Sequence, residues 1–103
     1  MAIYTLPESG GLHKTLVGAT ADRVEIPRRG RPREVEVTNR SSVEWLYVRA
    51  DSTAATVGAD GTTVVAPGSW VLLDVQPGDW LSLAGSGNPW SVAPSGAAGQ
   101  PHA

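Results

Sequence analysis

The chain has 103 residues, a length that predicts a single domain with one thin core. It contains no cysteine, which excludes disulfides and thiolate zinc sites, and its net charge of −2 argues against general attraction to nucleic acid or acidic lipid. No apolar run approaches the roughly 20 residues of a membrane-spanning helix. We therefore expect a small domain that binds neither nucleic acid nor a membrane.

Short β-branched runs between turn residues predict an all-β protein, because no window repeats apolar residues at helical spacing. We expect an extended N-terminal arm over residues 1–20, with or without a first strand, a β-sandwich domain over 21–94, and a C-terminal tail over 95–103. The predicted strands are 12–18, 21–26, 33–39, 43–50, 62–66, 69–75, 79–84 and 89–94. Seven to nine short strands fit an antiparallel β-sandwich or a small jelly-roll-like barrel.

Two Pro-Gly pairs, Pro67-Gly68 and Pro77-Gly78, separate consecutive predicted strands. Proline fixes φ at the second position of a turn and glycine supplies a positive φ at the third, so each pair predicts a type II turn. Such turns match the twist of a tight hairpin poorly, which favours corners or longer loops. We expect Asp79 to bond to turn amides and Asp74 to be solvated.

The residues do not assemble a recognisable catalytic or metal-binding motif. The two histidines, His13 and His102, lack metal-ligand spacing, and Ser69 has no base nearby in the sequence. The Pro-Gly-Asp turn at 77–79 is similar to part of a cupin motif, but the histidine cluster of metal-binding cupins is missing. We expect no enzyme and no cofactor, with a degenerate cupin-like enzyme as a weaker alternative.

The segment 27–33 (PRRGRPR) is the strongest charge feature, with Arg28, Arg29 and Arg31 among its basic residues. One hypothesis is a loop that grips an acidic protein surface. A solvated loop, neutralised by Glu25, Glu34 and Glu36, is the alternative, and nucleic acid is disfavoured because aromatic residues are not interleaved.

The four tryptophans fall in four different predicted strands. Trp45, Trp70 and Trp80 are out of phase with the neighbouring Leu and Val residues, which places them on the face opposite the core. Three interpretations stay open: packing in or at the rim of the core, a protein interface, or an aromatic platform for carbohydrate. The predicted protein-contact residues are Tyr4, Leu6, Arg28, Arg29, Arg31, Trp45, Tyr47, Trp70, Trp80 and Trp90.

Four segments carry a resemblance to a known group: VEVTNRSS (35–42), LYVRAD (46–51), ATVGADGTTVVAPGSW (55–70) and PWSVAP (89–94). They resemble small β-sandwich virion proteins of tailed phages that infect actinobacteria. The match covers roughly 60% of the chain and consists of strand and turn signatures, so it transfers no functional residue set.

The resemblance implies a structural role, most of all a capsid decoration (cementing) protein that binds and stabilises the shell of the major capsid protein. It further implies a homo-oligomer, with a trimer favoured, on the capsid exterior. Because the first residues lack a signal peptide, we expect synthesis in the host cytoplasm. The alternatives are a minor tail or head-tail component and a carbohydrate-binding module for surface attachment.

Overall fold

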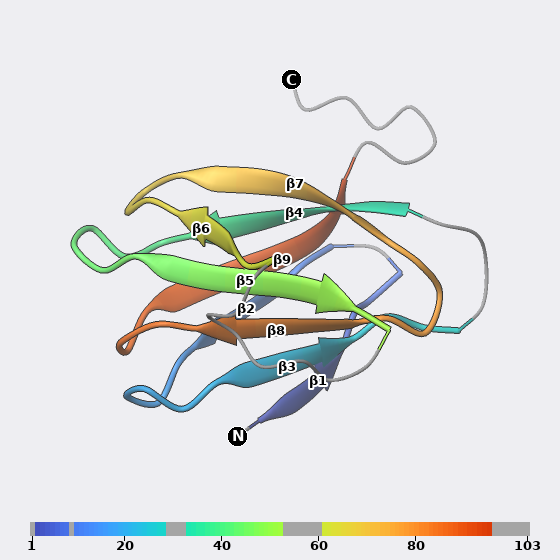
Figure 1. The fold of residues 1–103 in the computed structure, drawn as a ribbon, viewed down its shortest axis with the longest axis horizontal. Helices are drawn as coiled ribbons and strands as arrows, with labels where there is room; N and C mark the ends of the chain where they lie inside the picture. Colours follow the sequence, from blue (N-terminus) through green and yellow to red (C-terminus); the bar gives the residue numbers. More distant parts are fainter. Residues whose placement is uncertain (1, 9, 29–32, 53–60, 96–103) are drawn as a thin grey trace.

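A computed structural model describes residues 2–8, 10–28, 33–52 and 61–95, which form nine strands and no helix (Figure 1). No helix long and apolar enough to cross a membrane occurs within these ranges. The strands are β1 (Ile3–Thr5), β2 (Leu12–Thr15), β3 (Asp22–Glu25), β4 (Arg33–Asn39), β5 (Leu46–Asp51), β6 (Thr63–Val65), β7 (Trp70–Val75), β8 (Trp80–Ala84) and β9 (Pro89–Ser95). Each strand predicted from the sequence overlaps one of β2 to β9.

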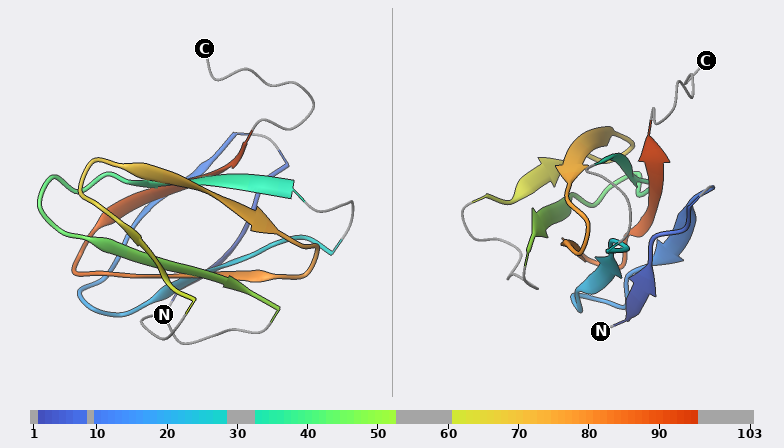
Figure 2. Two further views of the ribbon diagram at one scale, coloured as in Figure 1. Left: turned by 45° about the horizontal axis from the view of Figure 1, so that its top comes forward. Right: turned by 90° about the vertical axis from the view of Figure 1, so that its right-hand side faces the viewer.

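The strands form two sheets that pack face to face (Figure 2). Sheet A has the order β1-β3-β8-β5-β6 and sheet B has the order β2-β9-β4-β7. From β2 onwards all neighbours are antiparallel, and consecutive strands change sheet at every connection except β5 to β6. The predicted antiparallel β-sandwich is confirmed, and its strand order is that of a jelly roll. The one departure is β1, which pairs parallel to β3.

The core lies between the sheets and is built from alternate residues of each strand. Val35 and Val37 of β4 face Leu81 and Leu83 of β8, and all four side chains are fully buried. Burying a side chain of this kind contributes roughly 1.5–3 kcal/mol, so the Val/Leu alternation is the main stabilising feature of the sandwich.

Both Pro-Gly pairs are corners at which the chain passes from one sheet to the other. Pro67-Gly68 links β6 to β7 and Pro77-Gly78 links β7 to β8. The two glycines have φ values of 74° and 86°, and each turn is closed by a backbone hydrogen bond of 3.0 Å. The carboxylate of Asp79 accepts a hydrogen bond of 2.8 Å from the backbone N–H of Gln76, which confirms its predicted turn role.

Two strands of the sandwich, β1 and β2, lie within the predicted N-terminal arm, for which the sequence predicts the strand over 12–18 alone. β1 pairs with β3 and β2 pairs with β9. Leu6 and Leu16, which follow these strands, are 1% and 3% exposed. Burial of these two leucines stabilises the packing of the segment on the sandwich. The predicted tail begins as the last residue of β9, Ser95, and otherwise lies outside the described residues.

Candidate functional site

Two of the predicted contact residues, Trp90 and Leu6, belong to the core, so the prediction that they contact a partner is wrong. Trp90 is 0% exposed and its indole Nε1 donates a hydrogen bond of 3.2 Å to the buried carboxylate of Asp22. Its strand shows why: Trp90 and Val92 are in phase with each other, and Ser91 and Ala93 take the outer face. The phase argument used for the other tryptophans predicts this inward position.

Tyr4 closes the core on the side of β1 and β2. Its half-buried ring meets the ring of Trp90 edge to face, with the centroids 5.9 Å apart. The ammonium group of Lys14 lies 4.9 Å from the centroid of the Tyr4 ring, a cation–π contact. Tyr4 therefore seals the gap between the two edge strands, and only part of its ring is available to a partner.

Trp45 and Trp70 are exposed, by 49% and 58%, as their phase predicts. Trp45 and Tyr47 lie on the outer face of sheet A, whereas Trp70 lies on the outer face of sheet B. Trp80 is half-buried on the outer face of sheet A, where it pairs in register with Glu25 and Asp51. The sequence therefore places these three residues on the correct side of their strands.

β6 and β7 are the edge strands on one side of the sandwich (Figure 2). Exposed apolar residues occur on and beside the strands of this side, and we call them the apolar flank: Val43, Trp45, Tyr47, Val64, Trp70 and Leu72. Tyr47 and Val64 belong to sheet A, whereas Trp70 and Leu72 lie on the outer face of sheet B. Tyr47 and Val64 are direct cross-strand neighbours on β5 and β6. On the opposite flank, the exposed large apolar residues of the described ranges are Ile3 and Val17.

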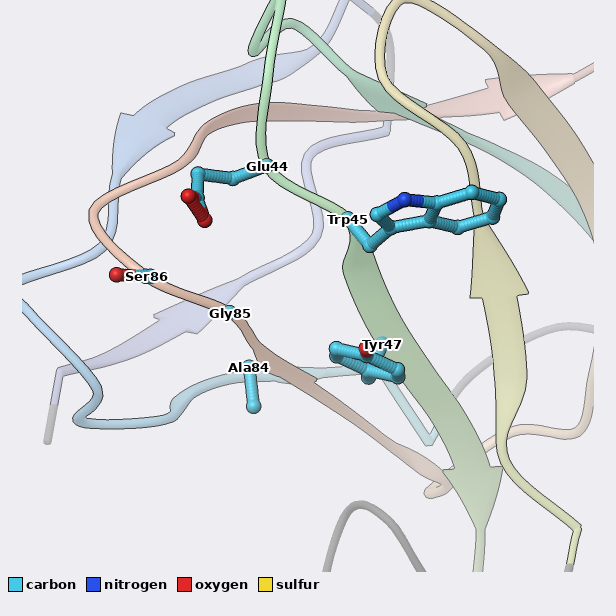
Figure 3. A pocket seen from close by; sticks show the side chains of 6 residues that line it. All are labelled: Glu44, Trp45, Tyr47, Ala84, Gly85 and Ser86. Carbon is cyan, nitrogen blue, oxygen red and sulfur yellow. The ribbon is translucent and has the colours of Figure 1, made fainter.

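A shallow pocket opens beside the apolar flank, with a volume of about 290 Å³. Its walls come from the segment that enters β5 and from the end of β8 and the loop after it (Figure 3). Trp45 and Tyr47 line one side, and Glu44 and Ser86 lie toward the other. The remaining lining residues, Ala84 and Gly85, are small. The pocket thus joins an aromatic wall to a carboxylate and a hydroxyl.

The buried side chain of Asn39 fixes the first wall of the pocket. Its Nδ2 donates to the carbonyl oxygens of Glu44 and Val65, at 2.7 and 3.1 Å, and its Oδ1 accepts from the backbone N–H of Ser41 at 3.1 Å. One amide therefore ties the β4–β5 loop to β6.

The buried side chain of Asn88 joins the second wall to the first. Its Nδ2 bonds to the carbonyl oxygens of Glu44 and Trp45 and to Oδ1 of Asn39, at 3.1 to 3.2 Å. Its Oδ1 accepts from the backbone N–H of Ser86 at 2.7 Å. The sequence analysis missed both asparagines and also Glu44 and Ser86, because the groups that the Asn88 Nδ2 bonds to lie more than 40 residues away in the chain.

Gly85 leaves room for this junction. A Cβ atom at position 85 would collide with the Asn88 side chain and lie 3.1 Å from the carbonyl oxygen of Trp45. Only glycine lets the β8 end approach the β4–β5 loop so closely. The close approach of the two pocket walls therefore depends on glycine at position 85.

Arg28 lies at the other end of the sandwich from the pocket, because it follows β3, whose end pairs with the start of β8, whereas the pocket lies at the end of β8. Arg28 is exposed, and its side chain passes over the Pro77-Gly78 corner. Arg29 and Arg31 lie outside the described residues. The structure thus separates Arg28 from Trp45 and Tyr47, so they cannot form one compact contact site.

His13 and Ser91 form a pair that the sequence analysis missed. Nδ1 of His13 lies 2.7 Å from Oγ of Ser91, and the two residues are cross-strand partners of β2 and β9 on an exposed face. A serine nucleophile also needs a group that orients the histidine, and no such side-chain bond to His13 occurs within the described residues. We read the pair as a cross-strand contact. The described ranges contain no group of three metal-ligating side chains.

These features define the protein as a β-sandwich domain with an exposed apolar flank and a small aromatic pocket. The chain matches no protein-family model and no curated protein. Among solved structures, it is similar to the pre-peptidase C-terminal domain of collagenase from Bacillus anthracis, with a TM-score of 0.52 and 11% identity, over 92% of this chain and 95% of that one. At this identity the similarity concerns the fold alone.

Proposed function

We propose that this chain is a non-catalytic contact module of a phage particle, most specifically a capsid decoration protein that binds the assembled shell of the major capsid protein. The observation that carries the proposal is the apolar flank, where Trp45, Tyr47 and Trp70 are exposed on a rigid sandwich. The resemblance to virion proteins supports it, and jelly rolls recur among viral capsid domains.

The physical mechanism is the burial of this flank against coat subunits. Tryptophan and tyrosine supply large, rigid contact area at little cost in conformational entropy, so they dominate many protein interfaces. A protein that binds only the assembled shell stabilises it by mass action. The edge strands β6 and β7, on the same flank, offer backbone donors and acceptors to neighbouring subunits or to further copies of this chain in the homo-oligomer, with a trimer favoured.

A carbohydrate-binding module has less support. Its aromatic platform would require several exposed rings in one plane, but Trp45 and Trp70 lie on opposite sheets and Trp90 is buried. A minor tail or head-tail component would use the same flank against a different virion protein, so it differs from the main proposal only in partner.

The test is to delete the coding sequence from the phage genome and to heat the resulting particles beside the parent particles. We expect the chain to co-purify with parent particles, and the deleted particles to release their DNA at a lower temperature. Equal heat resistance would contradict the cementing role. Presence of the chain in isolated tails, and not in heads, would favour the tail component.

A further inference from the structure

The pocket contains an acidic group that has no partner in the described part of the chain. The side chain of Glu44 is half-buried, and its carboxylate takes part in no hydrogen bond or ion pair there. The backbone of the same residue is fully engaged, because its N–H donates to Ser41 Oγ at 2.9 Å and its carbonyl accepts from Asn39 and Asn88. The backbone of Glu44 is therefore held in place, and its carboxylate is available to a ligand.

Two aromatic rings stand opposite this carboxylate. Trp45 and Tyr47 line the pocket from the β5 side, while the side chain of Glu44 extends toward Ser86 (Figure 3). Aromatic faces attract cations, and a guanidinium group also stacks on them through its own planar surface. A pocket lined by a carboxylate and by two exposed aromatic rings is thus complementary to a planar cation.

The charge of Glu44 favours a cation over a neutral polyhydroxylated ligand. Asn88 already occupies the carbonyl oxygens of Glu44 and Trp45, which face the junction of the two loops. The polar side chains of the lining are Glu44, Trp45, Tyr47 and Ser86, and Glu44 is the charged one. A sugar would leave that charge uncompensated, whereas a cation neutralises it.

We propose that this pocket receives an arginine side chain of the protein partner. The guanidinium group stacks against Trp45 and Tyr47 and donates hydrogen bonds to the carboxylate of Glu44. The Asn39–Asn88 junction holds both walls before the partner arrives, which lowers the entropy lost on binding. The proposal deepens the proposed function and rests on it only for the statement that the arginine belongs to a virion protein.

The experiment titrates the purified chain with N-acetyl-arginine amide and, separately, with its neutral isostere N-acetyl-citrulline amide. Side-chain resonances of Trp45 and Tyr47 are followed by NMR. We expect saturable shifts with arginine and at least about tenfold weaker binding of citrulline, since charge-assisted bonds are roughly twice as strong as neutral ones. Glu44→Gln should remove the preference for arginine, whereas Glu36→Gln, a half-buried glutamate on the outer face of sheet B, should keep it.

Other outcomes overturn the proposal. Equal binding of arginine and citrulline, or no saturable shift up to 100 mM, would rule out a guanidinium pocket (about 100 mM is a practical ceiling for a single-contact ligand). Stronger binding of methyl glucoside than of arginine would assign the pocket to carbohydrate. Because these titrations use no particle, they can succeed even where the deletion experiment fails, which separates the pocket chemistry from the decoration role.

Discussion

At the scale of single residues, the side chains of Asn39 and Asn88 join three segments of the chain through hydrogen bonds. Both side chains are buried, and they bond to backbone groups of the β4–β5 loop, of β6 and of the β8–β9 loop. A buried backbone group without a partner costs about 1–3 kcal/mol, so each amide removes several such penalties at once. The position of the aromatic pocket follows from these bonds.

Asn39→Ala is expected to lower the free energy of unfolding by about 3 kcal/mol, because it removes the side-chain partners of the Val65 carbonyl and of the Ser41 N–H, both of which are buried hydrogen bonds. Urea denaturation measures the change. Ser42→Ala, an exposed change in the same loop, is the control and should stay within about 0.5 kcal/mol of the parent. A loss of similar size in both variants would contradict the role given to Asn39.

The tryptophans test the assignment of core and surface. Trp90→Ala should cost about 3–5 kcal/mol, since it removes a fully buried ring and leaves Asp22 without its indole donor. Trp70→Ala, at an exposed position, should cost less than about 1 kcal/mol. Thermal unfolding of the two variants gives the comparison, and similar losses would show that the division between core and flank is wrong.

The phase of each tryptophan along its strand could be predicted from the sequence, because side chains alternate between faces. This argument places Trp45 and Trp70 correctly. The same argument predicts the inward position of Trp90 from its alternation with Val92, but the list of predicted contact residues did not take this into account. Glu44 could not be found in this way, since its role depends on Asn88, which reaches it across 44 residues.

At the scale of elements, turn chemistry was the most reliable guide to the fold. The two Pro-Gly pairs predict corners, and both corners carry the chain between the sheets. Within residues 1–20 the sequence predicts the strand over 12–18, which contains β2, but it misses β1, because three residues show too little alternation to signal a strand. Tertiary contacts hold β1 and β2 in the sandwich: they pair with β3 and β9, and the leucine that follows each strand is buried.

Leu6→Ala tests whether this segment belongs to the sandwich. A buried leucine truncated to alanine costs about 2–5 kcal/mol, whereas a leucine on a free arm would cost almost nothing. Chemical denaturation should therefore show a clear drop in stability, with Ile3→Ala, an exposed change on β1, as the near-neutral control. An unchanged denaturation midpoint for Leu6→Ala would contradict the assignment of this segment to the sandwich.

Gly85→Ala and Gly68→Ala test two different requirements for glycine. At Gly68, φ is positive but the space is open, so alanine should cost about 1–2 kcal/mol through backbone strain alone. At Gly85, a Cβ would collide with the Asn88 side chain and crowd the Trp45 carbonyl, so the pocket walls must move apart. NMR shifts of Trp45 and Tyr47 should change in the Gly85 variant and stay constant in the Gly68 variant. Shifts of equal size in both variants would contradict the junction.

At the scale of the whole molecule, the two flanks of the sandwich differ in character. The side of β1 and β2 is closed by Tyr4, whose ring packs between Trp90 and Lys14. The side of β6 and β7 exposes apolar residues along two sheet edges. Exposed edges and exposed apolar residues are liabilities in an isolated domain, so this side is the surface that the proposed contact would cover.

The most direct measurement is the binding of the purified chain to particles that lack it. We expect Trp45→Ser combined with Tyr47→Ser to weaken binding at least about tenfold, because central aromatic residues dominate interface energies. Ile3→Ser combined with Val17→Ser, a more exposed apolar pair on the opposite flank, should bind like the parent chain. Parent-like binding of the aromatic variant, with loss in the Ile3 and Val17 variant, would contradict the apolar flank as the contact surface.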